Sequence, residues 1–163
     1  MSRRRHFLQL LLAATLLLVC SPSHPRRTRT VHTSGTALRV LQIRTEKRGE
    51  REYDKKIPKS VLHVLRNRYK TLYKKYTLVK RDTRNAAMGA WEEFELDNKK
   101  VAAVKVHGYK PGPRLINLRI RFWGVEQKAD VYHGKHWFAL VEKGDTPLIL
   151  VITPKLIQTV TED

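Results

Sequence analysis

The stretch Arg114–Trp123, RLINLRIRFW, has the clearest structural pattern in the chain. Its apolar and polar residues alternate: the apolar set is Ile116, Leu118, Ile120 and Phe122, and the polar set is Asn117, Arg119 and Arg121. Successive side chains of a strand point to opposite faces, so a period of two separates the two sets. The stretch therefore predicts a strand with one buried face and one face in water.

Further strand patterns lie on both sides of this stretch. They are residues 38–43, 76–80, 91–96 and 100–107 before it, and residues 128–132, 136–142 and 148–152 after it. The segment Leu148–Ile152 is continuously apolar, which predicts a central strand covered on both faces, and Pro154 is expected to end it. The tripeptide at 133–135, His-Gly-Lys, has the length of a hairpin connection between its two neighbouring strands.

A single helix is expected at residues 58–74, because Pro58 suits a first helical turn. Its apolar residues follow three- and four-residue spacing and are Val61, Leu65, Tyr69, Leu72, Tyr73 and Tyr76. The strands have short connections and no second helix to provide parallel crossovers, so antiparallel pairing is expected. The sequence thus predicts an α+β fold, a mainly antiparallel curled or sandwich-like sheet packed with one N-terminal helix.

The N-terminus has the features of an export signal, expected over residues 1–23. Arg3–Arg5 precede the apolar run Phe7–Val19, which ends at a Cys-Ser-Pro-Ser sequence. The run has thirteen residues, whereas spanning a bilayer takes about 20, which favours cleavage or a loose anchor. Lipidation of Cys20 is an alternative, although Val19 replaces the usual small residue before it. The general secretory route suits this run better than the twin-arginine route, and periplasm, cell envelope or secretion is the expected location.

The remaining chain is expected to form a flexible linker at 24–36, one domain at 37–154 and a tail at 155–163. The whole chain has 33 basic and 15 acidic side chains, a net charge of +18. Removal of residues 1–23 leaves 30 basic against 15 acidic side chains, or +15. Such charge favours an acidic partner, and export makes lipid head groups or acidic glycans more natural partners than nucleic acid. The alternative is a solvated basic surface without a partner.

Several classes of chemistry are excluded by residue usage. Cys20 is the only cysteine, so a cleaved chain has no disulfide, thiolate nucleophile or cysteine-ligated zinc. Beyond the signal the only serines are Ser34 and Ser60, and neither lies in a Gly-x-Ser-x-Gly motif. No glycine-rich loop precedes a helix to bind nucleotide phosphates. We therefore expect a non-catalytic protein without a cofactor.

Two enzyme or metal alternatives remain open in the sequence. His107, His133 and His136 end strands or flank a turn, and converging imidazoles bind zinc or copper. Glu93 and Glu95 share one face of a predicted strand and are the residue types that divide general-acid and general-base roles in a hydrolase. Both groups also have a purely structural explanation. The histidines would be exposed to solvent, and the glutamates would pair with basic residues on a neighbouring strand.

The basic face of the predicted helix is the candidate binding surface. Its candidate residues for an anionic lipid or polysaccharide surface are Lys59, Arg66, Lys70, Lys74 and Lys75, with His63 and Arg68 nearby. Amphipathic tyrosine rings lie close in sequence to these cations. A solvated outer face of a helix that packs on the sheet is the alternative explanation.

The layout resembles that of small exported uncharacterised proteins of Gram-negative bacteria. The matching segments follow the N-terminal signal and are Ile57–Leu62, which opens the helix, then Tyr76–Val79, and the apolar stretch Leu148–Pro154. These segments are packing patterns, and the resemblance covers roughly residues 38–154. It implies an exported α+β domain, and it implies no activity and no site.

Overall fold

The computed structural model describes residues 29–69, 71–97, 99–110, 114–141 and 147–162. Residues 31–159 form one compact unit, and residues 1–30 with 160–163 form a second unit. The expected export signal and Cys20 lie outside the described residues. Within the described ranges, no helix is long and apolar enough to cross a membrane.

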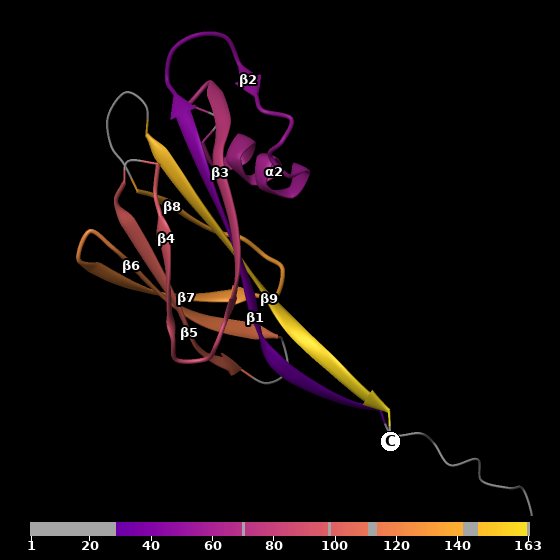
Figure 1. Ribbon diagram of the computed structural model, residues 1–163. Coiled ribbons are helices and arrows are strands. Elements are labelled where there is room, and N and C mark those ends of the chain that lie inside the picture. The colour runs from indigo at the N-terminus through magenta and orange to yellow at the C-terminus, as the bar shows by residue number, and fades with distance from the viewer. Residues whose placement is uncertain (1–28, 70, 98, 111–113, 142–146, 163) are drawn as a thin grey trace, which may run out of the picture. The chain divides into compact units, whose positions relative to one another are not determined.

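The described chain contains nine strands and one helix (Figure 1). In order they are β1 (Arg29–Glu46), β2 (Glu52–Tyr53), α2 (Lys59–Arg68), β3 (Lys75–Ala86), β4 (Trp91–Glu95), β5 (Val101–Lys110), β6 (Leu115–Phe122), β7 (Val125–Tyr132), β8 (Trp137–Leu140) and β9 (Leu148–Glu162). Strands account for most of the described residues, and the helix has ten residues. The predicted α+β fold with an N-terminal helix is therefore wrong, and the fold is mainly β, with one short helix after two strands.

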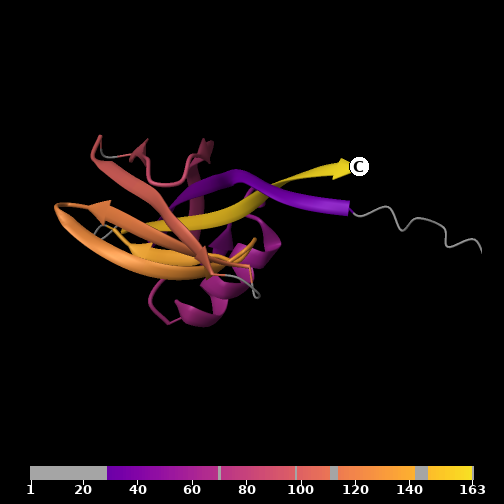
Figure 2. The ribbon, with the colours of Figure 1, turned by 90° about the horizontal axis from the view of Figure 1, so that it is seen from below.

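The strands form two curled sheets (Figure 2). The five-stranded sheet has the order β2-β3-β1-β9-β8, and the four-stranded sheet has the order β4-β5-β6-β7. The short β2 pairs parallel with β3, whereas β1 with β3, β8 with β9, and all pairs of the four-stranded sheet are antiparallel. In the four-stranded sheet and between β8 and β9, antiparallel pairing follows from connections too short for crossovers, as the sequence predicted.

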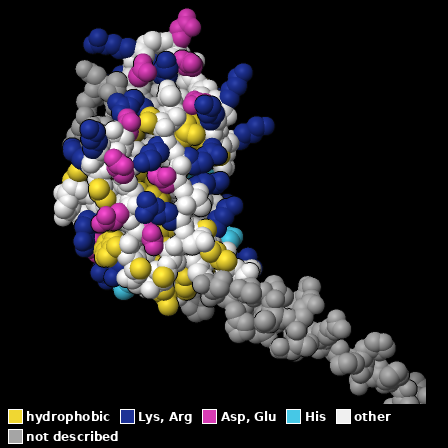
Figure 3. Space-filling model, viewed as in Figure 1, with side chains coloured by type: hydrophobic (Ala, Val, Ile, Leu, Met, Phe, Trp, Pro, Cys, Tyr) yellow, Lys and Arg dark blue, Asp and Glu magenta, His cyan; other side chains and the backbone are white. Residues whose placement is uncertain are grey.

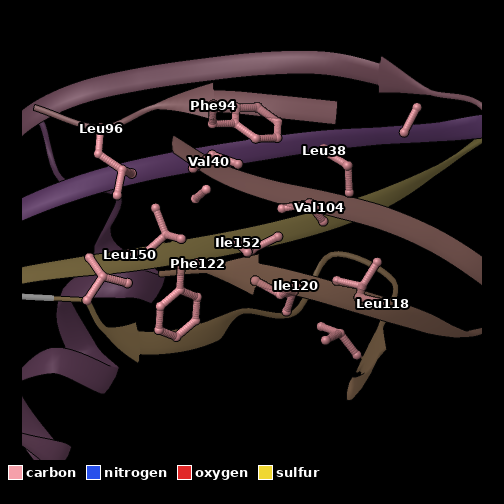
Figure 4. Packing of buried hydrophobic residues seen from close by; sticks show 14 of the residues in the cluster. Leu38, Val40, Phe94, Leu96, Val104, Leu118, Ile120, Phe122, Leu150 and Ile152 are labelled. Carbon is pink, nitrogen blue, oxygen red and sulfur yellow. The ribbon is translucent and has the colours of Figure 1, made fainter. Parts of the chain in front are cut away.

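The main core lies between the two sheets (Figure 4). Leu38 and Val40 of β1 and Leu150 of β9 face Phe94 of β4 and Ile120 of β6, and all are at most 1% exposed. The four apolar residues of the 114–123 pattern all belong to this core. The alternation is thus confirmed, and it leaves the polar set on the outer face of the four-stranded sheet.

A second core lies between the five-stranded sheet and α2. Leu41 and Ile43 of β1 and Ile149 of β9 pack there with Val61 and Leu65, which are one helical turn apart. Strand β9 therefore buries both faces, because Leu148, Leu150 and Ile152 face the other sheet. The predicted central strand at 148–152 is confirmed.

The helix is shorter than predicted and ends at Arg68 rather than at residue 74. The N–H of Tyr69 still donates to the carbonyl of Leu65, and the chain then turns into β3. Tyr73 and Tyr76 join the second core from this turn and from β3. Their spacing imitated a longer helix because the turn returns them to the same apolar cluster.

The predicted linker at 24–36 and tail at 155–163 overlap the ends of two long strands. Residues 29–36 belong to β1, and residues 155–162 belong to β9. Both segments contain several β-branched residues, which favour strands. Pro154 does not end β9. Pairing with β8 already stops at Ile152, so on that side of the strand a proline at position 154 removes no backbone hydrogen bond.

The connection at 133–135 is not a hairpin, because β7 lies in the four-stranded sheet and β8 in the five-stranded sheet. The segment instead moves the chain from one sheet to the other. The N–H of Gly134 donates to the carbonyl of Pro154 at 2.8 Å, and the N–H of His133 donates to the carbonyl of Arg114 at 3.0 Å. These bonds attach the connection to β9 and to the start of β6.

Candidate functional site: the outer face of the four-stranded sheet

The outer face of the four-stranded sheet brings three cations into one line. Strand register pairs Trp91 with Lys105, Lys105 with Arg119, and Arg119 with Lys128. Directly paired residues of antiparallel strands share a face with Cβ atoms about 4.5–5.5 Å apart. We call Lys105, Arg119 and Lys128 the cationic row, and Trp91 lies at its β4 end.

The row has acidic neighbours on β7, where Glu126 and Asp130 lie two residues on either side of Lys128. Glu126 of β7 accepts from Arg119 Nη1 at 3.2 Å and from Arg121 Nη2 at 3.0 Å. The hydrogen bond from Arg121 and the charge of Arg119 hold the pKa of Glu126 below its usual value. Among the described residues, no ion pair involves Lys105 or Lys128. Like charges directly opposite on a sheet are destabilising, so the row keeps an excess of positive charge at a structural cost.

Arg119 also has an unused donor. Its Nε is buried without a hydrogen-bond partner, although its Nη1 bonds Glu126. A buried donor without a partner costs free energy, and such groups are rare in native proteins. An oxyanion on this face would find the two lysines without carboxylate partners.

Trp91 is covered by two cations of the same face. The guanidinium carbon of Arg121 lies 4.4 Å from the ring centroid, and Lys105 Nζ lies 5.5 Å from it. Cations over a tryptophan ring are attracted by its quadrupole, with about 0.5–1 kcal/mol gained at exposed sites. The ring therefore orients Arg121 and Lys105 on the surface without neutralising their charge.

Two grooves flank the cationic row. The larger, of about 300 Å³, is lined by Trp91, Glu93, Val101, Ala103, Arg121, Phe122, Trp123 and Gly124. The smaller, of about 170 Å³, is lined by His107, Asn117, Leu118, Arg119, Lys128 and Asp130. Asp130 there binds Lys110 at 2.8 Å and also accepts from Asn117. The bond from Lys110, followed by the bond from Asn117, holds the pKa of Asp130 below its usual value.

Trp123 at the rim of the larger groove has an unusual backbone. It forms the two-residue turn between β6 and β7 with Gly124, and the φ angles are 53° and 74°. Turns with two left-handed residues favour Asn-Gly, and a bulky residue with positive φ is an outlier. The ring is nonetheless 45% exposed, with Phe122 edge-on at 5.7 Å and Lys100 Nζ at 5.1 Å. Such strain, when it persists, is concentrated at functional sites.

The predicted basic helix face is divided in the structure. Lys59 and Arg66 lie on α2, Lys74 follows the helix, Lys75 begins β3, and Lys70 lies outside the described residues. Arg66 lies over the Tyr53 ring, 4.1 Å from its centroid. Lys75 binds Glu52 at 3.2 Å and lies 3.9 Å from Glu46, and the bond to Glu52 raises its pKa above the usual value. Acidic neighbours thus offset part of the positive charge of this face. Lys and Arg side chains lie among acidic ones in Figure 3, so net charge alone selects no surface.

The three candidate histidines have separate surroundings. His133 Nδ1 accepts from the N–H of Leu156 at 2.9 Å. His136 contacts Thr153 Oγ1 at 2.8 Å and Ser60 Oγ at 3.0 Å, which links β9 to α2. His107 lines the smaller groove. Among the described residues, no group of three His, Cys, Asp or Glu side chains is placed to hold a metal ion.

Only one of the two candidate carboxylates lines a groove. Glu93 and Glu95 are exposed and lie on the same side of β4 as Trp91, as predicted. Glu93 lines the larger groove, whereas Glu95 does not belong to its lining. The backbone carbonyl of Glu95 accepts from Gln42 Nε2 at 2.8 Å and from Lys80 Nζ at 3.2 Å. The groove therefore holds one carboxylate of the pair, beside an arginine.

The sequence predicted that Arg119 and Arg121 face water, but it did not identify them as a site. Their partners Lys105 and Lys128 become neighbours only through strand register, which no single strand encodes. The turn at Trp123 was also missed, because it lacks the Asn-Gly sequence typical of such turns. Searches against family models, curated proteins and solved structures found no match to this chain.

Proposed function

We propose that this chain is an exported, non-catalytic protein that binds an anionic polymer on the outer face of the four-stranded sheet. The cationic row supports this proposal most directly. Three cations in direct cross-strand register repel one another, and a purely structural sheet face has no need of such an arrangement. A polyanion that lies across the strands would relieve the repulsion at several positions at once.

The surface is better suited to binding than to catalysis. Its row residues are arginine and lysine, which donate hydrogen bonds and do not accept protons at neutral pH. The row crosses three neighbouring strands and is about as long as two inter-strand spacings of about 4.8 Å. A row of cations across three strands suits an extended chain better than a small enclosed substrate.

The test compares two double charge reversals of equal size. Lys105→Glu/Lys128→Glu changes the row, and Lys59→Glu/Lys74→Glu changes exposed positions of the predicted helix face as the matched control. The purified protein is applied to immobilised polyphosphate and immobilised polygalacturonate, and the salt concentration that releases it is measured. Wild type should be retained at low salt and released as salt rises, because screening shortens to about 8 Å at physiological ionic strength.

The row variant should elute at clearly lower salt than wild type, and the helix variant should elute close to wild type. The opposite order would place binding on the helix face. If all three proteins elute at the same salt concentration, the outer face of the four-stranded sheet is not the binding surface. Failure of wild type to bind either polyanion would reject the proposed function.

A further inference from the structure

We infer that the groove between Trp91 and Trp123 holds a sugar ring of an acidic polysaccharide, whose carboxylates extend along the cationic row. This inference rests on the proposed function, and it specifies the chemical class of the polymer. It depends on the composition of the larger groove, in which two tryptophans, one arginine and one carboxylate line the same cavity of about 300 Å³.

The aromatic part of the groove suits a pyranose ring. Ligand sites combine aromatic walls with a few placed polar groups, and a sugar presents apolar C–H faces with hydroxyls at its edges. Trp123 offers a 45% exposed ring at a left-handed backbone position that a smaller residue would occupy more easily. Local rules are broken at functional sites when a compensating role exists. Stacking on a sugar ring would be such a role.

The polar part of the groove suits hydroxyl and carboxylate groups together. Register places Ala103 between Glu93 on one side and Arg121 on the other. The small Ala103 side chain leaves room between them at the base of the groove. The Glu93 carboxylate accepts hydrogen bonds from hydroxyls, and the Arg121 guanidinium donates a matched pair of bonds to a carboxylate.

The carboxylate of Glu93 is also the reason to prefer a sugar over a phosphate polymer. The Glu93 carboxylate accepts hydrogen bonds from the hydroxyls that sugars supply and that polyphosphate lacks. The neighbouring Glu126 acts in the same way beside Arg119 and Arg121. A bilayer surface, being flat, would not reach the floor of the groove at Ala103.

The spacing of the cations suits the same polymer. Neighbouring strands lie about 4.8 Å apart, so the row presents one positive charge per strand at that interval. This interval is comparable to the length of one pyranose residue in a chain. A polymer with a carboxylate on every sugar would therefore meet Lys105, Arg119 and Lys128 with successive charges after its first ring enters the groove.

The test uses Trp123→Asn, which removes the ring and gives the turn the favoured Asn-Gly sequence, so the fold is retained. Tyr132→Asn is the matched control, because Tyr132 is 52% exposed on the same sheet and lines neither groove. Binding of soluble oligogalacturonate and of polyphosphate is measured by calorimetry for wild type, both variants and Lys105→Glu/Lys128→Glu. Circular dichroism of each variant verifies the fold.

We expect Trp123→Asn to weaken oligogalacturonate binding by about tenfold, which corresponds to about 1.4 kcal/mol, and to leave polyphosphate binding unchanged. Tyr132→Asn should bind both probes as wild type does, and the row variant should lose both. Equal effects of Trp123→Asn on the two probes would overturn the sugar site. Wild type that binds polyphosphate but not oligogalacturonate would overturn it too, and the proposed function would stand. Wild type that binds neither would refute both.

Discussion

The strained turn at Trp123 permits a stability prediction that separates backbone strain from side-chain contacts. Two variants, Trp123→Asn and Trp123→Ala, remove the same ring. Both lose the edge-on contact with Phe122 at 5.7 Å, for which about 0.5–1.5 kcal/mol is typical. Both also lose the Lys100 ammonium at 5.1 Å, for which about 0.5–1 kcal/mol is typical at an exposed site. The contact loss is therefore about 1–2.5 kcal/mol in each variant.

The two variants differ in the backbone. A φ of 53° costs an ordinary L-residue about 1–2 kcal/mol, and asparagine adopts this region far more readily than tryptophan or alanine. Relief of strain in Trp123→Asn should offset most of the contact loss, so its free energy of unfolding should lie within about 1 kcal/mol of wild type. Trp123→Ala keeps the strain and should lose about 1–2.5 kcal/mol.

The assay is urea unfolding of wild type and both variants, followed by far-UV circular dichroism. The shift in midpoint at unchanged slope gives the difference in free energy. Asparagine should exceed alanine by about 1 kcal/mol or more, since only the backbone term separates them. A Trp123→Ala variant as stable as Trp123→Asn would show that the left-handed turn stores no strain, and would remove that support from the sugar site.

Three further outcomes are expected. Leu150→Ala should lower the free energy of unfolding by about 2–5 kcal/mol, because Leu150 is 0% exposed between the sheets. Leu140 is 38% exposed on the paired strand, so the control Leu140→Ala should lower it by less than about 1 kcal/mol. Burial first, then Arg39 and Lys135, lower the pKa of His136 below 6.5, so the unfolded state binds more protons. Stability should therefore fall as pH falls below about 6.5, and His136→Gln should flatten this dependence in urea titrations at pH 5 and pH 7.5. Glu126→Gln should strengthen polyphosphate retention, measured as the eluting salt concentration, because it removes the carboxylate that pairs with Arg119 and Arg121.

The sequence predicted individual strands well and their combination poorly. Each predicted strand overlaps an observed one, because alternation in 114–123 and the apolar run in 148–152 reflect burial directly. The fold class was wrong for two local reasons. The spacing of Tyr73 and Tyr76 extended the helix beyond Arg68, and the polar segments 29–36 and 155–162 concealed the ends of β1 and β9.

The candidate site was beyond the reach of the sequence for a different reason. Lys105 and Lys128 are 23 positions apart and become neighbours of Arg119 only when β5 and β7 pair with β6 in one register. Periodicity assigns a residue to a face of its own strand, but it does not select the residue opposite it. The predicted helix face, by contrast, was a local pattern, and its cations proved to be partly paired with Glu46 and Glu52.

The layer order explains why the binding surface should lie on the four-stranded sheet. The five-stranded sheet buries one face against the other sheet and the other face against α2, so residues 40–43 of β1 and 148–154 of β9 are buried on both faces. The outer face of the four-stranded sheet has no such cover among the described residues, and its outward positions alternate with core residues that fix them in place. A side chain on this outer face can be substituted with little effect on the core. Cations in cross-strand register on such a face, beside a strained and exposed tryptophan, are the observations on which the proposed ligand site rests.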